Sequence, residues 1–159
     1  MLEIGNGGLS PDEARTQMSL WALLAAPLIA GNDLGAVTSD DLAILVNSEV
    51  IAIDQDAAGM QGDRLWSQGP IEVWMRDLGD GGKAVGLFNR NAFSIRIPLA
   101  PNSLGWEQAE MVRDVWRHQD LPALKPETTF LVPSHGVILL ILHQDGTGHP
   151  GVATVHSHE

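Results

Sequence analysis

Three aspartates in the first part of the chain are the residues whose type and position could do chemistry. Asp33 follows Gly31 and Asn32 after a short apolar segment, and Asp54 and Asp56 follow a second apolar run. Two carboxylates that face each other with separated pKa values can serve as nucleophile and as general acid and base. Asn and Asp after a glycine more often form loops by binding their own backbone, so we expect that role for Asp33 and keep a catalytic or substrate-contacting role as the alternative.

Other polar side chains offer weaker candidates. Ser134 and His135 are sequence neighbours, but no acid is marked that would orient the histidine, so we expect a turn there. His149, His156 and His158 lie in a glycine-rich tail without an ordered second shell, so we expect solvated side chains and no metal site. The chain has no cysteine, which excludes a disulfide, a thiolate zinc site and a thiol nucleophile. Nothing in the sequence indicates a cofactor.

The five tryptophans could stack on sugar rings. We expect Trp21 to be core, because it lies on an apolar helix. Trp74 alternates with Val73 and Met75 and so belongs to the polar face of its strand. It should either pack at a domain interface or be exposed, and an exposed Trp74 could act as a platform for carbohydrate.

The balance of charge limits the classes of partner. Nine Lys and Arg against 20 Asp and Glu give a net charge of −11, which disfavours nucleic acid and anionic membranes. The apolar stretch from Leu20 to Ala30 is too short to span a bilayer and contains Pro27, so we interpret it as protein core. The chain shows no signal peptide and no transmembrane segment, and its compartment stays unknown.

The first sixty residues alternate between strand and helix patterns. Met1–Ile4 is strand-like, and Ser10 with Glu13 forms a capping box that predicts a helix ended by Pro27. Leu28–Ala30 predicts a short buried strand, and Thr38 or Ser39 predicts the cap of a second helix. Parallel strands with crossover helices bury both faces of their sheet, which two strands cannot do alone.

From Pro70 onward the apolar pattern has a period of two, which is typical of antiparallel strands. The strands predicted by this pattern are Ile71–Arg76, Lys83–Arg90, Phe93–Leu99, Ala109–Trp116, Thr128–Val132 and Val137–Leu142. Six or more short strands with turn residues between them indicate a sandwich, and the unbroken apolar run of the last strand predicts a central position. We leave Ser48–Asp54 open between helix and strand.

These patterns divide the chain into three parts. Residues 1–60 are expected to be a barrel-type α/β segment, residues 61–143 a β-sandwich domain, and residues 144–159 a disordered tail. The expected fold class is therefore the last two βα units of a (β/α)8 barrel followed by an antiparallel Greek-key sandwich.

Several segments give the chain a specific resemblance. MLEIGNGG, SLWALLAAPLIAGNDL and LAILVNSEVIAIDQD closely resemble the last part of the catalytic barrel in glycoside hydrolase family 27, the α-galactosidases and α-N-acetylgalactosaminidases. IEVWMRDL, KAVGLFNR, VRDVW and VPSHGVILL continue the resemblance into the sandwich. Residues 1–142 are covered and only the tail is left out.

The resemblance carries implications for catalysis. Members of this family retain stereochemistry by using two aspartates, a nucleophile and an acid/base, which lie on the fourth and sixth barrel strands and have no counterparts in this sequence. A sugar-binding aspartate that precedes the methionine matching Met1 is also absent. Met1 itself matches a position that lines the substrate pocket, so it is the single substrate-binding residue we expect, and we expect no catalytic residue.

We therefore expect the C-terminal fragment of an α-galactosidase-like retaining hydrolase, whose parent cleaves terminal α-galactosides and which is inactive when produced alone. We expect a truncated reading frame and some self-association through exposed apolar faces around Leu20, Leu23 and Leu24. The alternative is a non-catalytic β-sandwich module that binds carbohydrate or docks to a separate catalytic barrel.

Overall fold

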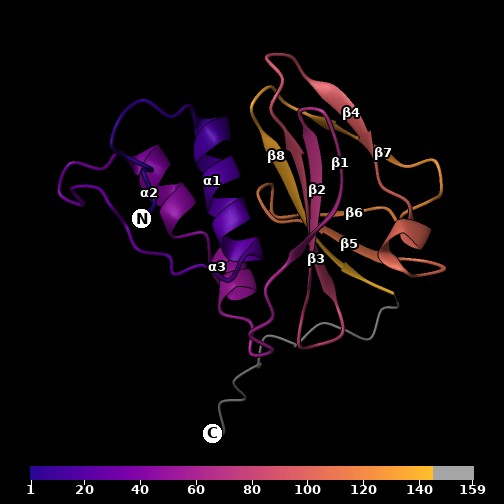
Figure 1. The fold of residues 1–159 in the computed structure, drawn as a ribbon. Helices are drawn as coiled ribbons and strands as arrows, with labels where there is room; N and C mark the ends of the chain where they lie inside the picture. The colour runs from indigo at the N-terminus through magenta and orange to yellow at the C-terminus, as the bar shows by residue number, and fades with distance from the viewer. Residues whose placement is uncertain (145–159) are drawn as a thin grey trace, which may run out of the picture.

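Helices cover one face of a six-stranded antiparallel sheet, and a two-stranded sheet covers the other face (Figure 1). This computed structural model describes residues 1–144. The predicted tail, residues 144–159, lies outside the described residues except for Gln144. The elements are α1 (Pro11–Leu23), α2 (Ser39–Leu45), α3 (Ser48–Asp54), β1 (Asp63–Gln68), β2 (Ile71–Asp77), β3 (Lys83–Asn89), β4 (Ile95–Pro98), a 3-10 helix (Pro101–Leu104), β5 (Met111–Asp114), β6 (Gln119–Leu121), β7 (Thr129–Val132) and β8 (Val137–His143).

Helix α1 begins as the sequence predicts. The Ser10 hydroxyl accepts a hydrogen bond from the Glu13 amide at 3.3 Å, and the Ser10 amide donates to the Glu13 carboxylate at 2.8 Å. The prediction that Pro27 ends the helix is wrong, because the helix ends at Leu23.

The C-terminus of α1 is closed by a Schellman arrangement of backbone hydrogen bonds. The Ala26 amide donates to the Trp21 carbonyl at 3.0 Å, and the Ala25 amide donates to the Ala22 carbonyl at 3.3 Å. Ala25 has a φ of 49°, a left-handed conformation for which glycine is the usual residue. Because alanine stands there, this helix end has no glycine signal in the sequence.

The predicted buried strand at Leu28–Ala30 is reduced to a single parallel bridge between Leu2 and Ala30. The Leu2 amide donates to the Ile29 carbonyl at 2.8 Å, and the Gly31 amide donates to the Leu2 carbonyl at 2.9 Å. Ile29 is 56% exposed, so the expectation of burial is wrong for this segment. Two short parallel segments offer each other too few hydrogen bonds and too little cover for a regular, buried strand to form.

The two following helices are capped by side chains. Thr38 accepts a hydrogen bond from the Asp41 amide at 3.1 Å at the start of α2, as the sequence predicts. The segment left open between helix and strand, Ser48–Asp54, is the helix α3. The Asn47 carbonyl oxygen accepts from the Glu49 and Val50 amides at 3.0 and 3.2 Å and starts this helix.

The main sheet has the strand order β1-β2-β3-β8-β5-β6, and β4 pairs with β7 in the second sheet. Strand β8 therefore lies inside the sheet between β3 and β5, as its unbroken apolar run predicts. Strands β1 and β6 were not predicted. Both lie at the edges of the sheet, and their sequences, DRLWSQ and QDL, are too polar for an alternating pattern to stand out.

Two apolar cores lie on the two faces of the main sheet. One core is shared between the helices and the sheet and contains Met18, Leu23, Phe88 and Leu139 among its members. The other fills the space between the main sheet and the β4–β7 pair. Leu23 is fully buried, so the expectation that it contributes an exposed apolar face is wrong: α1 covers the sheet instead of projecting into solvent.

The fold is thus a two-unit βα segment attached to an antiparallel β-sandwich, as the sequence predicts. Within residues 1–144, none of the helices is long and apolar enough to cross a membrane.

Candidate functional site

The two barrel-type segments bring together their carboxyl-terminal ends, where enzymes of (β/α)8 architecture carry their active sites. Leu2 and Ala30 form the bridge, and Met1 lies directly beside Gly31: a Cβ added to Gly31 would be 3.2 Å from the Met1 Cβ and 2.8 Å from the Leu2 carbonyl oxygen. Met1 is 72% exposed. The position predicted to line a substrate pocket therefore lies at the open edge of this pair of segments.

Asn32 is the residue at this edge that sequence reasoning missed as a possible contact. Both polar atoms of its amide are buried without a hydrogen-bond partner among residues 1–144. The amide lies against Gly5, where an added Cβ would come within 2.7 Å of the Asn32 nitrogen. A buried amide that lacks partners is costly, so it marks a place where further polar groups belong. The only sequence signal was an asparagine directly after the bridging segment.

Asp33 has the loop role that we expected. Its carboxylate accepts a hydrogen bond from the Gly35 amide at 2.9 Å, which closes a turn on its own backbone, and the residue is exposed. The bond from Gly35 is the only hydrogen bond of the Asp33 carboxylate among the described residues, and none links Asp33 to a second carboxylate.

Asp54 and Asp56 are used to fasten the helical part to the sheet. The Asp56 carboxylate accepts from the Gly79 amide at 3.0 and 3.1 Å, across from the β2–β3 turn. Asp54 ends α3, and its main-chain carbonyl accepts from Arg76. The three candidate aspartates thus serve three different structural contacts, and the structure does not bring them together as a catalytic pair.

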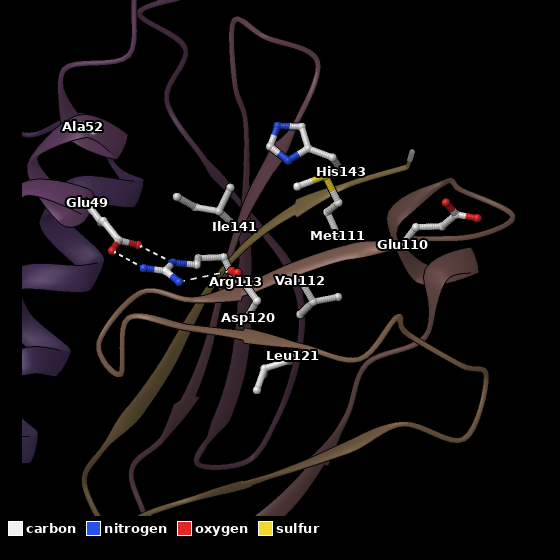
Figure 2. A pocket seen from close by; sticks show the side chains of 10 residues that line it. All are labelled: Glu49, Ala52, Glu110, Met111, Val112, Arg113, Asp120, Leu121, Ile141 and His143. Atoms are coloured by element: carbon white, nitrogen blue, oxygen red, sulfur yellow. Dashed lines mark hydrogen bonds and ion pairs between the residues drawn. The ribbon is translucent and has the colours of Figure 1, made fainter. Parts of the chain in front are cut away.

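A hollow of about 540 Å³ between α3 and the β5–β6 hairpin is lined by a cluster of charged side chains that includes Glu49, Arg113 and Asp120 (Figure 2). Arg113 donates to Glu49 through Nε at 3.0 Å and through Nη2 at 2.8 Å, and it donates to Asp120 through Nη1 at 3.1 Å. His118 Nδ1 lies 2.6 Å from the same Glu49 carboxylate.

The hydrogen bonds in this cluster shift the pKa values of its charged side chains, which limits the chemistry that the cluster can do. The hydrogen bonds from Arg113 hold the pKa of Glu49 below its ordinary value, with a further contribution from His118 and partial opposition from burial. Glu49 in turn raises the pKa of Arg113. A carboxylate with both oxygens engaged by a guanidinium is a poor nucleophile and a poor proton donor. The cluster therefore holds α3 to the sandwich and is not an acid–base pair.

The tryptophans serve packing. Trp74 is half-buried against the helices and donates to Glu72 at 2.8 Å, so of the two locations predicted for it, the domain interface is confirmed. Trp116 donates to Ser19 at 2.9 Å across the same interface. Trp21 packs against the core shared by the helices and the sheet, as predicted, but it is only partly buried and, with Trp74, lines a groove of about 350 Å³ beside α1.

The remaining polar candidates take structural positions or lie outside the described part. His135 has a φ of 51° in the turn before β8, and its carbonyl accepts from the Thr16 hydroxyl at 3.1 Å. His149, His156 and His158 lie outside the described residues. Within residues 1–144, no three His, Asp or Glu side chains gather in a way that could hold a metal ion.

Two family models match the two parts of this chain. The family model for the alpha galactosidase C-terminal beta sandwich domain matches residues 68–142, and the model "Alpha galactosidase A" matches residues 1–56. An α-galactosidase from Oryza sativa subsp. japonica is 41% identical over 77% of this chain and 30% of its own length. An alpha-N-acetylgalactosaminidase from Gallus gallus is 35% identical over 94% of this chain and 40% of its own length.

The likeness extends to solved structures. The crystal structure of α-galactosidase I from Mortierella vinacea matches with a TM-score of 0.85 and 31% identity, over 94% of this chain and 40% of that one. The chain spans 30 to 35% of the length of three curated relatives that it matches.

Proposed function

The chain belongs to glycoside hydrolase family 27, of which it represents the C-terminal portion, and from that membership we propose that it is the scaffold part of an enzyme that hydrolyses terminal α-galactosides. In this proposal the nucleophile and the acid/base carboxylates belong to polypeptide outside residues 1–159. The junction between the barrel-type segment and the sandwich lies near residue 60.

One observation carries the proposal. The match runs through both the barrel-type segment and the sandwich, while the carboxylates of Asp33 and Asp56 are bound in a turn and a backbone clamp and the Asp54 carboxylate is buried beside the Gln55 side-chain amide. Retaining hydrolysis needs two free carboxyl groups about 5 Å apart across the scissile bond, which these aspartates do not provide.

The proposal gives Met1 and Asn32 the places nearest to a substrate. Met1 lies at the open edge beside Gly31, and the Asn32 amide carries unsatisfied hydrogen-bonding capacity at the same edge. We propose that Met1 lines the sugar pocket once the neighbouring strands are in place. No cofactor or metal takes part in this proposal, because the two carboxylates suffice for the reaction.

The direct test is hydrolysis of an aryl α-galactoside. We expect no turnover by the 159-residue chain and turnover by a longer polypeptide that joins it to the first six βα units of a relative. Turnover by the 159-residue chain that is abolished by Asp33→Asn would overturn the proposal.

A second candidate is a non-catalytic module that binds carbohydrate. The groove lined by Trp21 and Trp74 favours it, because aromatic faces pack on sugar rings. Calorimetric titration with galactose and with a galactosyl oligosaccharide tests it, and absence of heat at millimolar ligand would dismiss it.

Self-association through the apolar side chains of residues 1–60 is a third use of this part of the chain, and size measurement in solution tests it.

A further inference from the structure

The chain contains a single asparagine that is followed by glycine, Asn6–Gly7, in the segment between the Leu2 bridge and α1. Both residues are exposed. Asparagine is among the chemically labile residues of proteins, because the backbone nitrogen of the next residue can attack its side-chain carbonyl carbon. Glycine at the next position leaves that nitrogen without a neighbouring Cβ to hinder it. The peptide Asn6–Gly7 therefore combines the labile side chain with the least hindered attacking group.

The backbone nitrogen of Gly7 is accessible in the folded chain. Its N–H has no hydrogen-bond partner among residues 1–144. A Cβ added to Gly7 or to Gly8 would meet no atom within 4 Å, so both residues face open space. Their φ angles of 74° and 113° are values that glycine adopts without strain. The Gly7 nitrogen can therefore turn toward the Asn6 side chain without displacing packed groups.

The Asn6 side chain joins the two short segments that form the parallel bridge. Its Nδ2 donates to Glu3 Oε2 at 2.7 Å and to the Gly31 carbonyl at 3.3 Å. Glu3 and Gly31 directly follow the bridged residues Leu2 and Ala30. An ionised carboxylate at position 6 has no proton to donate, so both hydrogen bonds would be lost, and it would repel the Glu3 carboxylate.

We propose that Asn6 is a site of spontaneous deamidation, and that the reaction loosens the contact between residues 1–4 and 28–31. The Gly7 nitrogen forms a bond to Asn6 Cγ, and the Cγ–Nδ2 bond breaks. The proton lost from Gly7 balances the third hydrogen of the ammonia that leaves. Water, the co-reactant, then opens the resulting succinimide ring at either carbonyl and gives aspartate or isoaspartate. Both products carry a negative charge, and isoaspartate also adds a methylene group to the main chain.

The other asparagines provide internal comparisons. Each is followed by a residue with a side chain, which crowds the attacking nitrogen: Asn32, Asn47, Asn89, Asn91 and Asn102. Asn102 is the best matched of these, because it is exposed and precedes the small residue Ser103. Its side chain makes no hydrogen bond to the described residues, so only the identity of the next residue favours Asn6 over Asn102.

The test incubates the purified 159-residue chain at pH 6 and at pH 9 and follows each asparagine by peptide mass spectrometry with separation of isoaspartate. At pH 9 we expect Asn6 to deamidate at least about tenfold faster than Asn102, because glycine leaves the attacking nitrogen unhindered. The rate at Asn6 should be lower at pH 6, because the attacking nitrogen must lose its proton.

Two matched variants identify the attacking nitrogen. Gly7→Ala and Gly8→Ala each add a methyl group at an open, left-handed position. Gly7→Ala should slow deamidation of Asn6 by about tenfold or more, whereas Gly8→Ala should change it by less than about twofold, because only the Gly7 nitrogen attacks.

Hydrogen exchange measures the structural consequence. In Asn6→Asp, which reproduces one product, the bridge amides of Leu2 and Gly31 should exchange at least about fivefold faster than in the unsubstituted chain. Asn102→Asp is the control and should leave both amides unchanged, and circular dichroism checks that each variant is folded. Equal deamidation of Asn6 and Asn102, equal rates in the two alanine variants, or unchanged exchange in Asn6→Asp would overturn the proposal.

Discussion

Arg76 is the residue that most directly joins the two parts of the molecule. It lies on β2, is 1% exposed, and donates to the Ala22 carbonyl at 2.7 Å and to the Asp54 carbonyl at 3.4 Å. These carbonyls lie at the C-terminal ends of α1 and α3, where the helix dipoles favour a cation. One buried guanidinium thus closes two helices against the sheet.

Replacing this guanidinium tests its contribution. Arg76→Met should lower the free energy of unfolding by about 2–4 kcal/mol, because it leaves buried carbonyls without donors. Arg64→Met is the control, because the Arg64 side chain is half exposed and its 3.8 Å contact with Glu72 is long, while Glu72 keeps Arg90 at 2.6 Å; the loss should cost about 0.5 kcal/mol or less. Urea unfolding measures both, and equal effects would contradict the role given to Arg76.

Glu49 should make stability depend on pH. Its pKa is lowered in the folded chain, chiefly by Arg113, so it binds fewer protons than in the unfolded chain just below pH 4.5. Its contribution to stability is present above its unfolded pKa and is lost as the pH falls through the lower, folded value.

The corresponding prediction compares two amide variants between pH 5 and pH 3. Glu49→Gln should flatten the loss of stability over this range, because the titrating group is removed. Glu127→Gln should keep the slope of the unsubstituted chain, because the exposed Glu127 has no hydrogen-bond partner for its carboxylate among the described residues. A slope unchanged by Glu49→Gln would show that Arg113 does not act on Glu49 in solution.

At the scale of the elements, close packing of α1 on β3 depends on a glycine. A Cβ added to Gly86 would lie 2.5 Å from the Phe88 ring and 2.7 Å from Leu23 Cδ1. Both neighbours belong to the core shared by the helices and the sheet, so neither can move freely.

Gly86→Ala should therefore destabilise the chain by about 1–3 kcal/mol through overpacking. Gly79→Ala is the matched control, since its added Cβ would meet its nearest atoms at an ordinary 3.5 Å. Thermal unfolding compares the two, and a Gly86→Ala variant as stable as Gly79→Ala would contradict the packing of α1 described above.

The elements that local chemistry specifies were the ones that the sequence predicted. The capping box of α1, the Thr38 cap of α2 and the apolar run of β8 each act within a few residues. The end of α1 at a left-handed Ala25, the edge strand β1 and the fading of Leu28–Ala30 depend on tertiary surroundings and gave no local signal. The candidate site divides in the same way. The loop role of Asp33 could be predicted from its sequence neighbours, whereas the burial of the Asn32 amide depends on the tertiary structure and could not.

Hydrogen exchange would show the consequence for stability along the chain. Because α1 and α3 share a core with the sheet, their amides should be protected nearly as well as those of β3 and β8. Residues 25–37, which have one bridge and several exposed side chains, should exchange much faster. Rapid exchange throughout α1 would mean that the helices do not hold to the sheet in solution.

At the scale of the whole molecule, the chain is a well-packed sandwich that carries a partial barrel on one face of its main sheet (Figure 1). Residues 1–60 carry most of the net negative charge, and the carboxylates of Asp33 and Asp56 in this segment are engaged in a turn and a clamp. In the proposed function this chain therefore serves as scaffold, and bond cleavage falls to polypeptide outside residues 1–159.

Covalent trapping tests that division of labour most directly. A retaining hydrolase forms a glycosyl ester on its nucleophile, and an activated fluoro-galactoside makes this ester long-lived enough for mass spectrometry. In the longer polypeptide that joins this chain to the first six βα units of a relative, we predict one galactosyl adduct within the added segment and none within the 159 residues of this chain. A galactosyl adduct on an aspartate of the 159-residue chain would contradict the account.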